Sequence, residues 1–140
     1  MDTIFGADRG VLYLEAPVSA LDDLDTSREQ GITTATEQFL DSPGGTFDKT
    51  IDSSLWQVRD LNTNTRAFAT WCQNEELDIE LCVIHLVYKK TNESGAFAQR
   101  ERFNTAGEEF QEMIAEQTKS EYTKWKSKIQ DHLQYRVRFS

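Results

Sequence analysis

The sequence predicts a small α+β domain: an antiparallel sheet with mixed edges and about four strands, packed by two N-terminal helices and a long C-terminal helix. Two observations carry this prediction. Residues 55–88 contain three successive runs of β-branched, aromatic and other apolar residues, separated by short polar turns. The segments before and after them have apolar residues at helical spacing. Strands grouped between helices are typical of an α+β domain built on an antiparallel sheet.

The N-terminal third is predicted to form one strand and two helices. The strand lies at residues 10–15, and Pro17 closes it because proline has no N–H to donate to a ladder. Apolar residues then return at helical spacing from Ser19, which has Asp22 three positions later in the manner of a capped helix start. We expect Gly31 to divide this stretch into two short helices.

Three antiparallel strands are predicted at residues 55–61, 66–72 and 79–88. The turn at residues 62–64 consists of short polar side chains that tolerate turn geometry. The third strand is almost entirely apolar, so we expect it to be central and covered on both faces. Six apolar side chains should be buried between the sheet and its helices: Trp56, Phe68, Leu81, Val83, Phe110 and Ile114.

The C-terminal part is predicted to be mainly helical. A loop is expected at residues 92–95, and Thr105 with Glu108 has the capping-box spacing of a helix start. Apolar residues at helical spacing continue to Leu133, with residues 118–120 as a place where the helix could be interrupted. Residues 135–139 alternate apolar and basic, which suits a final edge strand. We expect a single domain over residues 1–140, with a helical, basic extension from about residue 119.

Charge and composition limit the function classes. The 140 residues include 24 acidic and 15 basic side chains, giving a net charge of −9. A general nucleic-acid coat needs a basic surface, so this charge argues against one. The acids are concentrated in the first third, whereas the segment from residue 119 has a local basic excess that includes Lys124 and Lys128. Such a patch can attract anions even on an acidic protein.

Several compartments and chemistries are not expected. No apolar run approaches the roughly 20 residues that cross a bilayer, and no secretion signal opens the chain, so we expect a cytoplasmic protein that does not enter the membrane. A disulfide between Cys72 and Cys82 is conceivable across a hairpin, but reduced thiols are favoured in that compartment. Neither a glycine-rich phosphate loop nor metal-ligand spacing around His85 or His132 is present, so no metal or cofactor is expected.

Basic residues mark the ends of the three central strands. Arg59 lies late in the first, Arg66 opens the second, and Lys89 and Lys90 close the third. Antiparallel strands bring the end of one beside the start of the next, so these four cations can ring one edge of the sheet. They can also be explained as solvated surface charges that balance nearby acids.

The segments Trp-Gln-Val-Arg at 56–59, Arg-Ala-Phe at 66–68 and Val-Ile-His-Leu-Val-Tyr-Lys-Lys-Thr at 83–91 resemble the core of the RelE/ParE toxin superfamily, especially its HigB-like, phage-derived branch. The pattern there runs roughly Leu-Trp-Glu-Leu-Arg, Tyr-Arg-Val and Leu-His-x-Phe-x-Lys-Lys-Thr, so Gln57 stands in place of a glutamate. The order of elements over about residues 10–118 is similar too.

This resemblance implies the toxin component of a type II toxin–antitoxin system. Active members are ribosome-dependent endoribonucleases that cut mRNA in the ribosomal A site without a metal. The 2′-hydroxyl attacks the adjacent phosphate and leaves a cyclic phosphate. By motif position, three residues would be catalytic: Arg59, Arg66 and Lys89. The two arginines would hold the scissile phosphate, and the lysine would grip RNA or assist proton transfer.

Three further lysines are candidates for RNA binding. Lys90 is assigned by its motif position, and Lys124 and Lys128 by the local basic excess. The resemblance also implies a cognate antitoxin protein that covers the cationic edge, with the ribosome and mRNA as further partners.

Two other hypotheses remain, because a fold does not fix a function. The first is a non-catalytic RelE-like protein-binding module, of the kind encoded by phages or mobile elements. It would bind its partner through the acidic helical face formed by Asp22, Asp23, Asp25 and Glu29. The second is an α+β interaction protein unrelated to this superfamily.

Overall fold

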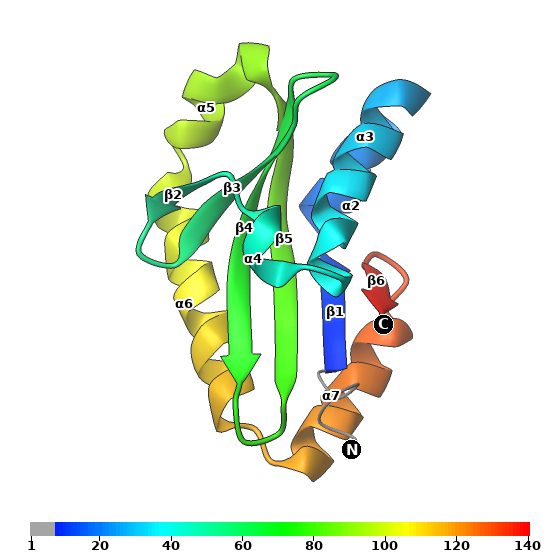
Figure 1. Ribbon diagram of the computed structural model, residues 1–140, viewed down its shortest axis with the longest axis vertical. Coiled ribbons are helices and arrows are strands. Elements are labelled where there is room, and N and C mark those ends of the chain that lie inside the picture. The colour runs from blue at the N-terminus through cyan, green and yellow to red at the C-terminus, as the bar shows by residue number, and fades with distance from the viewer. Residues whose placement is uncertain (1–7) are drawn as a thin grey trace.

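A computed structural model describes residues 8–140 as a mixed sheet with helices on both faces (Figure 1). The strands are β1 (Asp8–Tyr13), β2 (Lys49–Asp52), β3 (Leu55–Asp60), β4 (Thr65–Asn74), β5 (Ile79–Lys89) and β6 (Arg136–Phe139). The helices are α2 (Glu15–Asp22), α3 (Thr26–Glu37), α4 (Pro43–Thr46), α5 (Glu93–Phe97), α6 (Arg100–Glu116) and α7 (Lys119–Gln130), with 3₁₀ turns η1 (Gln38–Leu40) and η2 (Lys90–Asn92).

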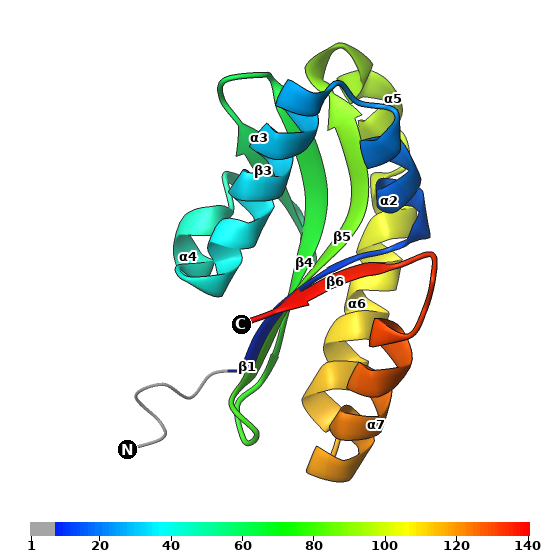
Figure 2. The ribbon, with the colours of Figure 1, turned by 90° about the vertical axis from the view of Figure 1, so that its right-hand side faces the viewer.

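The sheet has the order β2-β3-β4-β5-β1-β6. The β2–β3, β3–β4 and β4–β5 pairs are antiparallel, β1 runs parallel to β5, and β6 is antiparallel to β1. Helices α3 and α4 lie on one side of the sheet, and α5, α6 and α7 lie on the other (Figure 2). We call these sides the N-terminal face and the C-terminal face.

The α+β class and the mixed sheet are confirmed, but the prediction of about four strands is wrong. Six strands form within residues 8–140. The predicted strands from residues 55, 66 and 79 are present, and β5 is central as expected. The edge strand at the C-terminus is also confirmed as β6. Strand β2 was missed because it is an edge strand of only four residues with no buried position, so it has no alternating apolar pattern.

The predicted start of the first helix is wrong. Helix α2 begins at Glu15, with Pro17 inside it and buried. Proline is accepted in the first turn because the N–H groups there have no helical partner, so Pro17 does not end β1. Ser19 lies within α2 instead of capping it. The N-cap of α2 is Leu14, and no side chain bonds the first turn. A side-chain cap is present at the next helix, α3, where Asp25 accepts a 2.9 Å hydrogen bond from the backbone N–H of Arg28.

Gly31 does not divide the helices as predicted, since it lies inside α3. A Cβ at this position would lie 2.0 Å from Oδ2 of Asp60 on β3. The glycine therefore allows α3 to approach the buried carboxyl of Asp60 closely, and the break between α2 and α3 falls at residues 23–25 instead.

The predicted long C-terminal helix is two helices. Helix α6 begins at Arg100, so Thr105 is an interior residue and does not cap it. The capping box is at Thr118, where the Thr118 and Glu121 side chains each bond the other's backbone N–H at 3.2 and 2.9 Å. This second start coincides with the predicted interruption. The expected loop at 92–95 is also wrong, because η2 and α5 occupy it.

The apolar core divides between the two faces. On the N-terminal face Leu21, Ile32 and Phe39 pack against strand residues including Val11 and Ile84. On the C-terminal face the predicted core residues Phe68, Leu81, Val83 and Ile114 are fully buried and Phe110 is partly buried. Trp56 is also only partly buried, and it lies on the N-terminal face, where its ring packs against that of Phe47.

Both cysteines are buried free thiols, as predicted for the reduced form. Cys72 is in the core of the C-terminal face and Cys82 in that of the N-terminal face. Their side chains therefore lie on opposite sides of the sheet, and burial raises the pKa of both thiols, that of Cys72 to about 12.

Candidate functional site

The cations predicted at the strand ends gather at one end of the sheet. Arg59 of β3 and Arg66 of β4 are direct cross-strand partners, and Lys89 of β5 pairs with Thr65, the neighbour of Arg66. The backbone N–H of Lys90 donates a 3.0 Å hydrogen bond to the carbonyl oxygen of Asn64. This is the end of the sheet that carries α5 and the β3–β4 turn (Figure 1).

The two faces of the sheet separate these cations. Cross-strand partners point to the same face, so Arg59 and Arg66 share the C-terminal face. Lys89 alternates with Tyr88 and points to the N-terminal face. There Asp25 has a lowered pKa, mainly because of hydrogen bonds from Arg28 and to a smaller degree because of the Lys89 charge. The structure thus pairs the two arginines across β3 and β4, although Arg59 also lines a pocket with Ala35 and Gln38 on the N-terminal side. It places the Lys89 side chain on the N-terminal face.

Arg66 is the most enclosed of these cations, with 7% of its surface exposed. One of its terminal nitrogens, Nη1, forms an ion pair with the carboxylate of Glu93 at the start of α5. Its Nε atom is buried and has no hydrogen-bond partner among the described residues. A buried, planar guanidinium with a vacant donor is suited to an anion that presents two acceptor oxygens, such as a phosphate or carboxylate.

A chain of polar contacts joins Tyr88 to Arg59. The Tyr88 hydroxyl donates a 3.1 Å hydrogen bond to Oε1 of Gln57, and Nε2 of Gln57 donates a 2.9 Å bond to Oδ2 of Asp48. The other Asp48 oxygen, Oδ1, lies 3.5 Å from Nη2 of Arg59. Gln57 is almost fully buried, so this series of polar contacts holds both the Tyr88 hydroxyl and the Arg59 guanidinium in position.

Tyr88 adds a proton-carrying group beside the arginines. Its Cα partner across β4 is Arg66, because a bulge in the β4–β5 ladder leaves His85 without a partner. Burial raises the pKa of Tyr88 to about 12, and the Arg66 charge offsets part of that rise. The phenol therefore keeps its proton at neutral pH and can donate it.

The predicted RNA-binding lysines of the C-terminal extension lie elsewhere. Lys124 and Lys128 are exposed on α7. That helix is at the opposite end of the molecule from α5 and the β3–β4 turn (Figure 1). The structure therefore does not bring these lysines to the arginine pair.

His85 is a core residue. It is 2% exposed, and its Nε2 lies 2.7 Å from Oγ1 of Thr70. The Thr70 hydroxyl donates to the carbonyl oxygen of Ser54 at 2.8 Å, so the proton between Thr70 and His85 belongs to Nε2. Burial lowers the pKa of His85 to about 4, which keeps the ring neutral.

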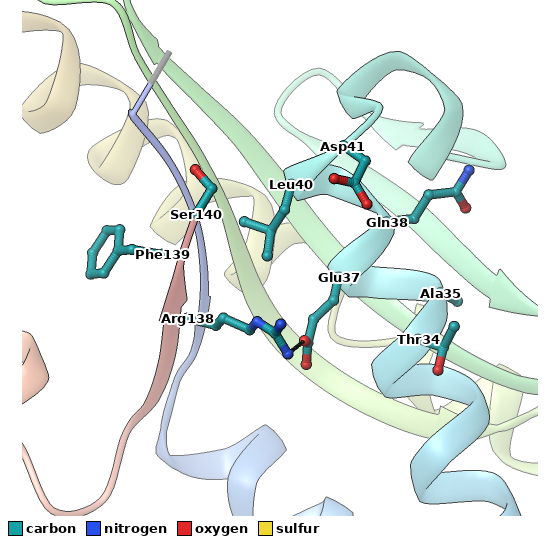
Figure 3. Close-up of a pocket in the computed structure, with 9 residues that line it drawn as sticks. All are labelled: Thr34, Ala35, Glu37, Gln38, Leu40, Asp41, Arg138, Phe139 and Ser140. Carbon is teal, nitrogen blue, oxygen red and sulfur yellow. Dashed lines mark hydrogen bonds and ion pairs between the residues drawn. The ribbon is translucent and has the colours of Figure 1, made fainter. Parts of the chain in front are cut away.

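A separate groove of about 690 Å³ lies between α3, η1 and β6 (Figure 3). Glu37 and Arg138 form a 2.8 Å ion pair across it, and its other lining residues include Leu40, Asp41 and Phe139. The Arg138 cation is already paired and the remaining charged lining residue is acidic. This groove therefore offers no group of cations for a phosphate.

Sequence reasoning missed four residues of the arginine site: Asp48, Gln57, Tyr88 and Glu93. Gln57 was noticed only as a departure from a family pattern, and Tyr88 only as one of a run of apolar strand residues. The register of β3, β4 and β5 would have pointed to both, since it puts them on the face of Arg66. Asp48 and Glu93 gave no signal, because Asp48 directly precedes β2 and Glu93 begins α5, and neither element was predicted.

No helix within residues 8–140 combines the length and the apolar character needed to cross a bilayer. In the same range, no cluster of three or more histidine, cysteine, aspartate or glutamate side chains is arranged to hold a metal ion. Comparison of the chain with protein-family models, curated proteins and solved structures gives no significant match.

Proposed function

We propose that this protein is a toxin component of a type II toxin–antitoxin system, a ribosome-dependent mRNA endoribonuclease that uses Arg66 and Arg59 to bind the scissile phosphate. The observation that carries the proposal is the arginine pair itself. Arg59 and Arg66 are direct cross-strand partners on β3 and β4, and the more buried of them, Arg66, has a vacant donor at Nε.

The arrangement suits a phosphodiester cleavage that proceeds through a phosphorane. Charge accumulates on the equatorial oxygens of that species, and arginine forks in a low-dielectric site stabilise it strongly. Tyr88 lies beside Arg66 with its proton in place and can supply it to a leaving oxygen. Lys89 and Lys90 would then contact RNA from the rim of the site instead of sharing the arginine face.

The proposal is tested by inducing wild type, Arg66→Lys and Arg59→Lys in a susceptible host while growth and new mRNA 5′ ends are followed. Lysine keeps the charge but loses the planar fork. We expect cleavage by each variant to fall about a hundredfold, while its circular dichroism spectrum stays that of the wild type.

Arg138→Lys is the matched control, because Arg138 also pairs with a glutamate but is exposed on β6. It should cleave at the wild-type rate. Equal growth of all four strains, with no new ends in the wild type, would rule out the nuclease.

A second candidate function is a non-catalytic protein-binding module. The observation that favours it is that both arginines already face carboxylates, Arg66 that of Glu93 and Arg59 that of Asp48. Asp22, Asp23 and Asp25 are exposed at the α2–α3 junction and offer an acidic surface to a basic partner. A wild type that cuts no mRNA but binds a basic protein, with binding lost in Asp22→Asn/Asp23→Asn, would favour this module.

A further inference from the structure

The ion pair between Arg66 and Glu93 is asymmetric. The Arg66 side chain is 8% exposed, whereas the Glu93 side chain is 38% exposed. The cation is therefore held inside the protein, and its partner reaches in from the surface. The carboxylate occupies a position from which an external anion would otherwise reach the guanidinium.

We propose that Glu93 is an internal competitor for the anion site at Arg66, so that a phosphate binds there only when the Glu93 carboxylate leaves. This inference rests on the proposed function, because it assigns the regulation of the same arginine site. The ligand class is a phosphate group, either in a nucleic-acid strand or in a small free anion.

The physical argument begins with the buried cation. A guanidinium removed from water loses its hydration and needs an anion close by. Glu93 supplies that anion from within the chain while the site is empty. An incoming phosphate supplies the same charge with more acceptor oxygens, and it can also reach the vacant Nε donor of Arg66 that Glu93 leaves without a partner.

The surroundings of Glu93 allow it to leave without unfolding the helix. It is the first residue of α5, and no side-chain cap holds that end. The other end of α5 is fixed by buried Ala96 and by Phe97, whose ring lies edge-on to that of Phe68 at 5.6 Å. Rotation about the bonds of the Glu93 side chain therefore releases the carboxylate into water while α5 stays packed.

Calorimetric titration at low ionic strength tests the proposal with two probes. One is inorganic pyrophosphate, and the other is a DNA trinucleotide, which lacks the 2′-hydroxyl and so stays intact. Glu93→Gln removes the charge but keeps a hydrogen-bond acceptor. We expect it to bind both probes about tenfold more tightly than wild type, because the competing charge is gone.

Two further variants make the result specific to this site. Glu112→Gln removes the same charge from an exposed position on α6 that belongs to none of the ion pairs among residues 8–140, and it should change either affinity less than twofold. In Arg66→Gln/Glu93→Gln the tenfold gain should vanish. Affinity that is unchanged or weaker in Glu93→Gln overturns the proposal and makes Glu93 a residue that positions Arg66.

The outcomes also separate this inference from the nuclease. A gain for both probes without any mRNA cleavage supports the competition and removes the nuclease. A gain for pyrophosphate alone supports the competition as well, and identifies the ligand as a small free anion. Cleavage by wild type with no gain in Glu93→Gln leaves the nuclease standing and removes the competition.

Discussion

The two faces of the sheet differ in the polarity of what they bury. The core of the N-terminal face is apolar, apart from a few groups such as Tyr13 and Thr36, whose hydroxyls bond each other. The C-terminal face buries a larger group of polar side chains: Ser54, Gln57, Arg66, Thr70, Asn74, His85 and Asn104.

The polar groups of the C-terminal face hold α6 against the sheet. Asn104 Oδ1 accepts a 2.6 Å bond from the backbone N–H of Ser54, and the Ser54 hydroxyl donates to Gln111 at 2.6 Å. Asn74 donates to the carbonyl oxygen of Ile114 at 2.9 Å. Apolar contacts can slide, but each of these bonds has one partner and one direction. The comparison teaches that the N-terminal face is held by the fit of apolar side chains. On the C-terminal face, directed hydrogen bonds also fix the position of α6 along the sheet.

The first prediction tests whether the two faces are equally well packed. Phe39 on the N-terminal face and Phe68 on the C-terminal face are both completely buried. Phe39→Ala and Phe68→Ala should each lower the free energy of unfolding by about 3–5 kcal/mol. Urea denaturation measures both, and a much smaller loss for Phe68→Ala would show that the polar face is loosely packed.

The second prediction concerns acid sensitivity through His85. The folded chain keeps this ring neutral down to pH about 4, whereas an unfolded histidine takes up a proton near pH 6.5. Between these values the unfolded state binds more protons, so the stability that His85 confers is complete above pH 6.5 and is lost as the pH falls to about 4. The loss should total about 3 kcal/mol.

Denaturation at pH 7 and pH 4 measures this loss, and His85→Gln should remove it. Glutamine cannot be protonated in this range and can still bond Thr70, so the stability of the variant should fall about 3 kcal/mol less than that of the wild type. His132→Gln, at an exposed position, is the control. Identical slopes for wild type and His85→Gln would contradict the prediction.

The third prediction tests the closeness of α6 to β4. A Cβ on Gly107 would lie 2.3 Å from Oγ1 of Thr70 and 2.8 Å from the carbonyl oxygen of Ser54. Because the second of these atoms is backbone, Gly107→Ala should cost about 1–3 kcal/mol. Gly95→Ala has open space and lies in a helix, so it should be neutral or gain up to about 1 kcal/mol. A thermal melt that ranks the two equally would contradict the close approach.

The smallest effect is expected at the cap of α7. Thr118→Ala removes the oxygen that accepts from the backbone N–H of Glu121 and should cost about 1 kcal/mol. Thr105→Ala is the matched control, because Thr105 has the same spacing to Glu108 but lies inside α6. A larger loss for Thr105→Ala in urea denaturation would mean that the helix start has been misplaced.

The features that could be predicted from the sequence are those set by the spacing of apolar residues and by the residue types of turns. The central strands, the turn with Asn64 at φ 55° and the pairing of Arg59 with Arg66 all followed from local patterns. Helix starts did not, because Thr105–Glu108 and Thr118–Glu121 have the same spacing and only tertiary packing decides which one caps a helix. Gly31 shows the same limit, since its role depends on Asp60 across the core.

The candidate site was predicted only in part, for a related reason. Strand ends can be inferred from sequence, so the two arginines were expected to meet. The side to which Lys89 points depends on the bulge at His85, which no local pattern indicates. The partners Asp48 and Glu93 lie outside the predicted strands, and their contacts become visible only once α5 and β2 are placed.

The parallel pairing of β1 with β5 has a consequence for the order in which the chain folds. β3, β4 and β5 are joined by tight turns and can pair as soon as they are made. β1 precedes these strands in the chain, yet its partner β5 begins only at Ile79 and its other partner, β6, only at Arg136. Closing such long loops is slow. During synthesis β1 therefore has no partner until β5 is made, and its other side stays unpaired until β6 follows.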